Sequence, residues 1–508
     1  GNYKEAMKSN ESAEWKRACD EEIAAHKENS TYELVELPKG RKPITCRWVF
    51  AKKDNGVFKG RLVARGFTQV KGIDYNETFS PVVRYESIRL MLSIAAKNGM
   101  AVHQMDVKTA FLNGFLQEEL YMTQPEGYVV KGRETSVLRL KKSLYGLKQA
   151  PLVWNERIHS VLSSLGFVRN GAEYCLYSRK SEKSFVMVAL YVDDLLITGT
   201  SDFAIRKVKS ELMNVFKMKD LGIVRKFLGI NISQDNGGIN MSLKDYIGSM
   251  LKEFGMENCN PDKTPTIAGQ ELTLVDNSAE DCDATAYRSL VGKLLFAANT
   301  VRSDISYIVG VLSRYLKEPK EVHYKAAKRV LRYLKGTKDL GIRYEAGNND
   351  NGELLGYCDA DWAGDKSDRK STTGFVFKYA NGAITWRSKK QATVALSTAE
   401  AEYMSLSEGV KEALWLMQVF KEFGINTGPV RMFDDNQGCI EMAKHPAFHH
   451  RTKHIDIRTH FIRDHIGSGS INLEYLSTGV MIADMFTKGL AAPQFLELRR
   501  LCGMETLN

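Results

Sequence analysis

Apolar side chains recur along most of this chain at the spacing of helices or strands. In residues 1–30, Trp15 and Ile23 lie at helical intervals between charged positions, which predicts an amphipathic helix. Residues 85–98 and 286–336 show the same pattern. Much of the chain is therefore expected to be helical.

The N-terminal half also contains strand signals. Residues 45–52 and 57–63 are rich in strand-forming side chains, and Asp54-Asn55-Gly56 between them is typical of a hairpin turn. Residues 200–235 carry signals for a helix, a turn and a strand. This half is therefore expected to combine helices with antiparallel sheet.

Two polar stretches divide the chain. Residues 258–285 contain Asn-Pro and Thr-Pro steps followed by acidic residues. Residues 347–352 have the sequence Gly-Asn-Asn-Asp-Asn-Gly. Both compositions are typical of loops or linkers. The second stretch is the clearest linker in the chain, and we therefore predict a domain boundary there.

Beyond the second stretch, strand and helix signals alternate in the order β-β-β-α-β-α-α-β-α. Ser397-Thr-Ala-Glu400 is typical of a capping box and predicts a long helix that ends near Phe423. A last helix is expected to open at Ala483-Asp484. The strands are expected at residues 354–359, 374–379, 383–387, 430–435 and 472–476.

The composition is that of a globular protein with several domains. The chain has 508 residues, enough for about three domains, and 43% of them are hydrophobic, which excludes disorder over most of its length. No apolar run reaches the roughly 20 residues of a membrane helix. The net charge of +10 favours a polyanionic partner.

The cysteines and the first residue bear on the setting of the protein. The eight cysteines are scattered without a C-x-x-C pair, which argues against a structural zinc site and a disulfide framework, and indicates a reducing compartment. The chain begins at Gly1 without a signal peptide, so we expect it to be a piece of a longer chain.

A first group of carboxylates lies inside an apolar segment. Residues 185–191 are apolar, Asp193 and Asp194 follow, and an apolar run resumes at Leu195. This pattern predicts a hairpin with both acids at its end, close to Asp106 at the end of an earlier strand. Such a pair is often only turn chemistry. Within so long an apolar run, however, three carboxylates could hold two divalent ions, with Mg²⁺ favoured by hard oxygen ligands and Mn²⁺ as the alternative.

The end of this hairpin contains a known motif: Tyr191-Val-Asp-Asp194 resembles the Y-x-D-D box of reverse transcriptases. Four further segments accompany it: Arg61-Leu-Val-Ala-Arg-Gly-Phe-Thr-Gln69, Thr78-Phe-Ser-Pro-Val-Val83, Gln104-Met-Asp-Val-Lys-Thr-Ala-Phe-Leu-Asn-Gly114 and Leu144-Tyr-Gly-Leu-Lys-Gln-Ala-Pro151. In their order and rough spacing these segments resemble the Pol polyproteins of copia-type (Pseudoviridae) LTR retrotransposons, and the resemblance extends over nearly the whole chain.

The resemblance implies a fold and a set of metal ligands. The expected fold class is α/β and α+β multidomain, a right-hand polymerase followed by an RNase H-like α/β domain. Residues 1–240 would be fingers and palm, 241–347 thumb and connection, and 348–508 the RNase H-like domain. Asp106, Asp193 and Asp194 would be the catalytic metal ligands of the polymerase.

The resemblance also implies residues that bind the nucleotide. Phe111 falls where the family places a side chain against the sugar 2′ position, although a core Phe is the plainer interpretation. Tyr145 and Gly146 fall where related enzymes support the incoming dNTP. Lys52 and Arg61 would hold its triphosphate through charge-assisted hydrogen bonds, unless they only solvate a basic hairpin.

A second group of carboxylates follows the linker. Its motifs resemble a copia-type RNase H: Gly356-Tyr-x-Asp-Ala-Asp-Trp-Ala-Gly364, Ser397-Thr-x-Glu-Ala-Glu-Tyr403, Asp434-Asp-Asn-Gln437 and Ala483-Asp-x-Phe-Thr-Lys488. By that match Asp359, Glu402, Asp435 and Asp484 are the catalytic ligands of a second pair of Mg²⁺ ions.

Neighbouring acids leave some choices open. Glu400 stands at the third helical position, where it can reach back to the Ser397 amide, and is therefore expected to cap the helix. Glu402 is left to bind metal. Asp361 and Asp434 remain candidates for supporting positions beside the ligands.

Six of the ten histidines lie between residues 445 and 465. A zinc site there is unsupported, because no Cys is interleaved and His454 and His460 are six residues apart. We expect a basic helix that faces nucleic acid or solvent.

Together these patterns predict an RNA-directed DNA polymerase with ribonuclease H activity. Its expected partners are an RNA template, a DNA primer, the RNA–DNA hybrid, dNTPs and a host tRNA primer, with no membrane. The life cycle of such elements implies a cytoplasmic virus-like particle and nuclear entry of the DNA-containing complex. The rival interpretation is an inactive or domesticated nucleic-acid-binding protein derived from an element.

Overall fold

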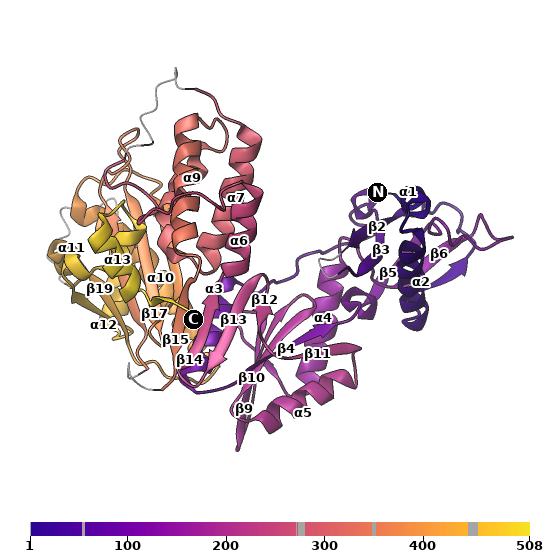
Figure 1. Cartoon of the computed structure of the whole chain (residues 1–508). Helices are drawn as coiled ribbons and strands as arrows, with labels where there is room; N and C mark the ends of the chain where they lie inside the picture. The colour runs from indigo at the N-terminus through magenta and orange to yellow at the C-terminus, as the bar shows by residue number, and fades with distance from the viewer. Residues whose placement is uncertain are drawn as a thin grey trace.

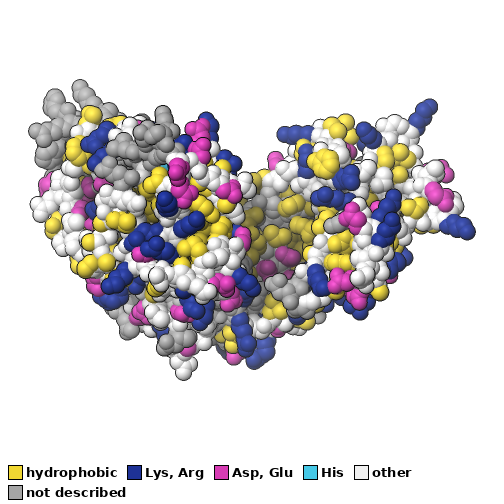
Figure 2. All heavy atoms as spheres, turned by 45° about the horizontal axis from the view of Figure 1, so that its top comes forward, with side chains coloured by type: hydrophobic (Ala, Val, Ile, Leu, Met, Phe, Trp, Pro, Cys, Tyr) yellow, Lys and Arg dark blue, Asp and Glu magenta, His cyan; other side chains and the backbone are white. Residues whose placement is uncertain are grey.

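The computed structural model describes residues 2–52, 56–270, 272, 280–347, 352–444 and 456–507, the side chains of 456, 457 and 459 excepted. Figure 1 shows an N-terminal lobe joined through a central sheet to a larger C-terminal lobe, and Figure 2 shows the hollow between them. None of the described helices is long and apolar enough to cross a membrane. Parts of four sequence predictions lie outside the described residues: Asp54 and Asn55, 273–279, 348–351, and His445, His449, His450 and His454.

The N-terminal lobe consists of two helices, a hairpin and a small sheet. The predicted N-terminal helix is split in two, because Asn2 caps a first short helix that ends at Lys8. Trp15 packs edge-on against Phe58 of the hairpin, with 4.5 Å between ring centroids. The elements are α1 (Tyr3–Lys8), α2 (Ser12–Glu28), β1 (Tyr32–Val35), the hairpin β2 (Cys46–Lys52) and β3 (Phe58–Ala64), β5 (Phe115–Met122) and β6 (Val137–Lys142).

The central sheet has six strands in the order β11-β4-β10-β9-β8-β7. Helices α4 and α5 bury Trp154 and Val208 on one face, and α3 packs on the other. The predicted helix at 85–98 and the predicted hairpin at 185–199 are both present. The elements are α3 (Tyr85–Lys97), β4 (Val102–Val107), α4 (Ala150–Ser164), β7 (Val168–Arg169), β8 (Leu176–Ser181), β9 (Ser184–Tyr191), β10 (Asp194–Gly199), α5 (Asp202–Met213) and β11 (Met218–Ile223).

A third sheet has the order β12-β13-β14-β15-β21, with α3 packed against β14 and β15 and α6 against β13. The predicted boundary at residue 240 falls within β14, and the last strand, β21, comes from the end of the chain. The sheet therefore collects strands from all three predicted units, whose division stays a prediction. The elements are β12 (Lys226–Phe227), β13 (Ile230–Asp235), β14 (Gly238–Ser242), α6 (Lys244–Glu253), α7 (Ala284–Thr300), α8 (Ser306–Leu312), α9 (Glu321–Gly336), β15 (Leu340–Glu345) and β21 (Met504–Thr506).

The C-terminal sheet has the order β18-β17-β16-β19-β20, with β19 parallel to both of its neighbours. The expected succession of elements is present, except that the last helix does not open at Asp484. Asp484 lies on a short 3₁₀ helix, Ile482–Phe486, and the α-helix begins only at Ala492. The elements are β16 (Leu355–Asp361), β17 (Thr372–Tyr379), β18 (Gly382–Lys390), α10 (Thr398–Glu422), β19 (Val430–Asp434), α11 (Gln437–Lys444), α12 (Asp456–Gly467), β20 (Ile471–Tyr475) and α13 (Ala492–Leu501).

One buried arginine joins the central sheet to the rest of the molecule. Arg89 of α3 is 1% exposed and donates hydrogen bonds of 2.7 Å to the carbonyls of Ile384, Asn299 and Thr300. Its guanidinium also lies 3.8 Å from the ring centre of Trp386. A single side chain therefore links α3, α7 and β18.

Replacing Arg89 by Met should destabilise the protein, because three buried carbonyls would lose their donor and each stranded group costs about 1–3 kcal/mol. We expect the melting temperature to fall by about 5 °C or more. Scanning fluorimetry would measure the change. Arg84→Met, which removes an exposed guanidinium from the residue before the same helix, should leave the melting temperature near that of the wild type. Equal values for both variants would contradict the junction role of Arg89.

Candidate active sites

The first carboxylate group lies where two antiparallel strands end. Asp194 of β10 is the cross-strand partner of Asp106 in β4, and the Val107 amide donates to the Asp193 carbonyl at 2.8 Å. All three carboxylates are half-buried. Burial raises the pKa of Asp194, the hydrogen bond from Gln104 opposes that rise, and the charges of Asp193 and Asp106 add to it. The structure thus brings the three predicted residues together.

The hairpin turn between β9 and β10 has an unusual backbone conformation. Val192 has φ of 54°, in the left-handed region that β-branched residues rarely adopt. The indole Nε1–H of Trp154, on α4, donates to the Val192 carbonyl at 2.6 Å. This hydrogen bond fixes the turn that carries Asp193. The sequence offered no signal for it, since Trp154 lies 38 residues away on a helix.

Four of the five predicted nucleotide-binding residues lie together. The rings of Phe111 and Tyr145 are edge to face at 4.7 Å, and the Arg61 guanidinium lies 4.5 Å from the Tyr145 ring centre. Burial raises the pKa of Tyr145, the positive charge of Arg61 opposes that rise, and the negative charges of Asp193 and Asp106 add to it. Tyr145 therefore lies close enough to the polymerase carboxylates to interact with their charges. A β-carbon on Gly146 would lie 2.1 Å from the Ala64 carbonyl, so only glycine fits there.

The fifth predicted residue, Lys52, lies elsewhere. Its ammonium forms an ion pair with Glu11, in the segment that precedes α2, and lies 4.8 Å from the ring centre of Phe58. Arg61 is also partly neutralised, because Glu22 lies 3.7 Å from it. Of the two predicted phosphate contacts, the structure therefore places only Arg61 beside Tyr145.

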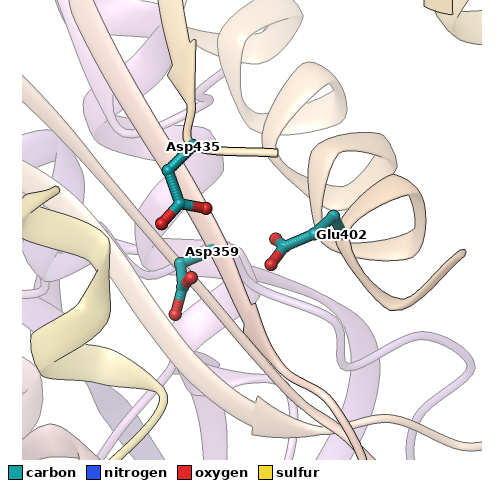
Figure 3. A group of neighbouring side chains, drawn as sticks. All are labelled: Asp359, Glu402 and Asp435. Atoms are coloured by element: carbon teal, nitrogen blue, oxygen red, sulfur yellow. The ribbon is translucent and has the colours of Figure 1, made fainter. Parts of the chain in front are cut away.

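The second carboxylate group is more deeply buried. Asp359 of β16, Glu402 of α10 and Asp435 after β19 offer ligand atoms that all lie within 4.8 Å of one another (Figure 3). In the described parts of the chain no other three acidic, His or Cys residues meet this spacing. Asp359 and Glu402 are 2% and 5% exposed. Burial raises the pKa of both carboxyls, and that of Glu402 is raised well above its ordinary range.

Asp484, the fourth predicted ligand, reaches this group from the 3₁₀ helix. It is fully buried and shares a hydrogen bond with Asp359. The Lys488 ammonium lies 2.9 Å from Asp484 and 3.9 Å from Asp359, and the Thr487 hydroxyl donates to Asp359. Lys488 and Thr487 are functional neighbours that we did not predict, although both close the motif that contains Asp484.

The neighbouring acids take the supporting positions that the sequence left open. Asp434 is buried and accepts hydrogen bonds from the Asn436 amide at 2.8 Å and the Cys439 thiol at 3.4 Å. Glu400 accepts from the Leu396 amide at 2.7 Å, while Ser397 accepts from the Glu400 amide at 3.2 Å. Glu400 is thus engaged at the helix start.

The donor set of the second group fits a hard divalent cation. It consists of carboxylate oxygens alone, which Mg²⁺ and Mn²⁺ prefer. One buried oxygen of Glu402, Oε2, has no hydrogen-bond partner among the described residues. An unpartnered carboxylate oxygen at this depth is costly unless a cation balances it. Asp359, Glu402 and Asp435 could therefore hold a metal ion, with Asp484 beside them.

The sequence of this chain is similar to those of known reverse transcriptases and transposon proteins. Residues 29–268 match the family described as reverse transcriptase (RNA-dependent DNA polymerase). The chain is 42% identical over 516 residues to the retrovirus-related Pol polyprotein from transposon TNT 1-94 of Nicotiana tabacum, covering 99% of this chain and 39% of that relative. It is 43% identical over 310 residues to a transposon Ty5-1 protein of Saccharomyces cerevisiae, covering 61% of this chain and all of that relative.

A solved structure resembles the fold. A foamy viral protease–reverse transcriptase in complex with double-stranded DNA superposes with a TM-score of 0.51 at 12% identity, covering 92% of this chain and 70% of that one. At that identity the likeness concerns the fold, and it confirms the predicted polymerase fold class. The chain spans about two-fifths of the length of the tobacco relative.

The buried acids predict a pH dependence of stability. Burial raises the pKa of Asp434 to about 7, against the hydrogen bonds from Asn436 and Cys439. A folded state whose carboxyl pKa is raised binds more protons than the unfolded state between about pH 4 and 7, so the free energy of unfolding falls as pH rises through that window. Without metal, Asp434→Asn should reduce this fall.

In EDTA, the loss of melting temperature between pH 5.5 and pH 8 should be smaller in Asp434→Asn than in the wild type by about 2 °C. The exposed Asp464→Asn on α12 serves as the control and should follow the wild type. A pH dependence in Asp434→Asn equal to that of the wild type would show that this carboxyl does not titrate in the window.

Proposed function

Because the chain belongs to the family of copia-type retrotransposon Pol polyproteins, we propose that it is an RNA-directed DNA polymerase with a ribonuclease H unit. The observation that carries the proposal is the pairing of Asp106 with Asp194 beside Asp193, within the segment that matches reverse transcriptases. Three half-buried carboxylates at the end of a strained hairpin suit phosphoryl chemistry better than a structural turn.

In the proposed polymerase site, this chain positions a dNTP and a primer end. Asp106, Asp193 and Asp194 hold two divalent ions, for which we propose Mg²⁺, and bound ions supply the positive charge that a triphosphate and its leaving group require. The edge of Phe111 faces the sugar and excludes a 2′-hydroxyl. Tyr145 and Gly146 form the wall behind it, and Arg61 contacts a phosphate. Lys52 joins this group only if it leaves Glu11.

In the proposed nuclease site, Asp359, Glu402, Asp435 and Asp484 serve as ligands to divalent ions that act on a phosphodiester of RNA paired with DNA. The four residues come from a strand, a helix, a strand end and a 3₁₀ helix, so the sheet fixes their positions before substrate binds. Thr478 donates a hydrogen bond of 2.6 Å to Asp435 and orients it. Lys488 balances the negative charge of Asp359 and Asp484.

The partners and the setting belong to the same proposal. We propose an RNA template, a DNA primer strand, dNTPs, a host tRNA as the first primer, and a cytoplasmic particle from which the DNA-containing complex enters the nucleus. The net charge of +10 supports a polyanionic partner, and binding through backbone phosphates would be sensitive to salt.

Primer extension on a labelled RNA template, with dNTPs and Mg²⁺, tests the proposal. Asp193→Asn should reduce the rate of primer extension by at least about a hundredfold, while cleavage of the RNA strand is retained. Asp435→Asn should do the reverse. This double dissociation would establish two separate sites on one chain, since each variant serves as the folding control for the other.

If the wild type binds the RNA–DNA hybrid but neither extends nor cleaves it, the proposal fails. The chain would then be an inactive or domesticated nucleic-acid-binding protein. Loss of both activities in either single variant would instead contradict the assignment of two independent sites.

The hydrogen bond from Trp154 to the Val192 carbonyl gives a further prediction. Trp154→Phe should lower the rate of extension by about tenfold or more, because a misplaced Asp193 costs rate even when the fold is intact. Trp415→Phe is the matched control, since it also removes one indole hydrogen bond to a carbonyl, that of Ala172 at 3.2 Å. Single-turnover extension would measure both variants, and equal rates would contradict the role of Trp154.

A further inference from the structure

The last residues of strand β18 carry three cations whose surroundings differ. Lys390 forms ion pairs with Asp365 and with Asp368, the latter at 2.9 Å. Arg387 is exposed and lies 3.9 Å from Glu408, a carboxylate that also pairs with Lys411 at 2.8 Å. Lys389 is exposed, and no carboxylate among the described residues pairs with it. Arg387 and Lys389 are therefore less neutralised by neighbouring carboxylates than Lys390 is.

These two side chains line two clefts at once. A larger cleft, of about 710 Å³, runs from Tyr191 of the catalytic hairpin, past Arg84 and the end of α7, to β18. A smaller cleft, of about 130 Å³, is lined by the same two residues together with Gln391 and Met404. Arg387 and Lys389 therefore border both clefts.

Each cleft is lined in part by an element that also carries one of the candidate active sites. Tyr191 is the cross-strand partner of Asp194, which in turn is the partner of Asp106, so the three side chains share one face of the central sheet. The larger cleft thus opens on the face that carries the polymerase carboxylates. In the smaller cleft, Met404 lies on α10, which also carries Glu402 of the nuclease group, and Thr373 is the cross-strand partner of Ala360, the residue after Asp359.

The charges along this route favour a polyanion. Besides Arg387 and Lys389, the larger cleft contains the exposed Arg84. Its one acidic lining residue, Glu86, lies 3.6 Å from the buried Arg89. The small side chains of Ser306 and Gly310 also line the cleft and leave room for a sugar–phosphate backbone to approach.

We propose that Arg387 and Lys389 contact backbone phosphates of the RNA–DNA hybrid where it leaves the polymerase site and approaches the nuclease site. This inference rests on the proposed function. These contacts do not depend on the base sequence of the hybrid, because every nucleotide presents the same backbone phosphate. Their effect is to hold the duplex against both sites at once, so that the affinity increases with duplex length until the hybrid reaches β18.

The test measures binding of fluorescent RNA–DNA hybrids of increasing length by the full chain, over a range of salt concentrations. In Arg387→Ala/Lys389→Ala, the dependence of log affinity on log salt should flatten by about two for long hybrids, about one for each lost phosphate contact. Hybrids too short to reach β18 should bind the variant and the wild type alike. Lys183→Ala/Lys421→Ala, which removes two exposed lysines outside both clefts, controls for net charge.

The inference would be overturned by an unchanged slope in Arg387→Ala/Lys389→Ala, by an equal change in the control pair, or by an equal loss for short and long hybrids. Lys389→Met breaks no ion pair among the described residues, so it controls for misfolding, and it should flatten the slope by about one. A preference for an acidic peptide over the hybrid would also overturn it. Failure here is distinguishable from failure of the proposed function, because primer extension and RNA cleavage by the wild type test that function separately.

Discussion

The burial of clustered carboxylates, together with their mutual repulsion, is the constraint on which both candidate sites depend. Asp106, Asp193 and Asp194 meet at strand ends, and a second group is buried around Asp359. Burial raises the pKa of these acids where a shift is resolved, which means that the fold holds them at a cost in free energy. The surrounding chain offsets part of that cost through Gln104 in the first site, and through Thr487 and Lys488 in the second. The part of this free-energy cost that the chain does not offset favours the binding of cations.

Holding such groups in place requires a rigid frame, and the frame extends across the predicted units. Arg89 connects α3 to α7 and β18 through buried carbonyls. At another corner, Arg302 and Asp304 form a fully buried ion pair at 2.7 Å, and Arg499 of α13 donates to Tyr333 of α9 at 3.0 Å. The last strand, β21, completes the sheet of β15. The C-terminal unit is therefore part of the frame that positions the central sheet, rather than an appended module.

The sequence predicted what depends on local pattern. The hairpin before Asp193, the capped helix that begins after Ser397 and the order of the C-terminal strands all follow from apolar periodicity and from capping and turn chemistry. It could not predict contacts between distant residues, such as Trp154 with Val192 or Lys52 with Glu11, because neither periodicity nor spacing encodes them. The α-helix expected at Asp484 was wrong for a similar reason: Asp484 lies on a 3₁₀ helix that packs against the distant strands β16 and β17, whereas the α-helix starts only at Ala492.

The two groups of carboxylates differ in exposure, and that difference suits their proposed substrates. The polymerase acids are all half-buried, so in the proposed function part of the balancing charge can arrive with a nucleotide. Of the nuclease acids, Asp359, Glu402 and Asp484 are buried and Asp435 is half-buried. A cation of the chain, Lys488, already lies against Asp359 and Asp484. In the proposed mechanism, Lys488 offsets the repulsion within this buried group before substrate binds, and a metal ion together with the hybrid would replace part of its interactions.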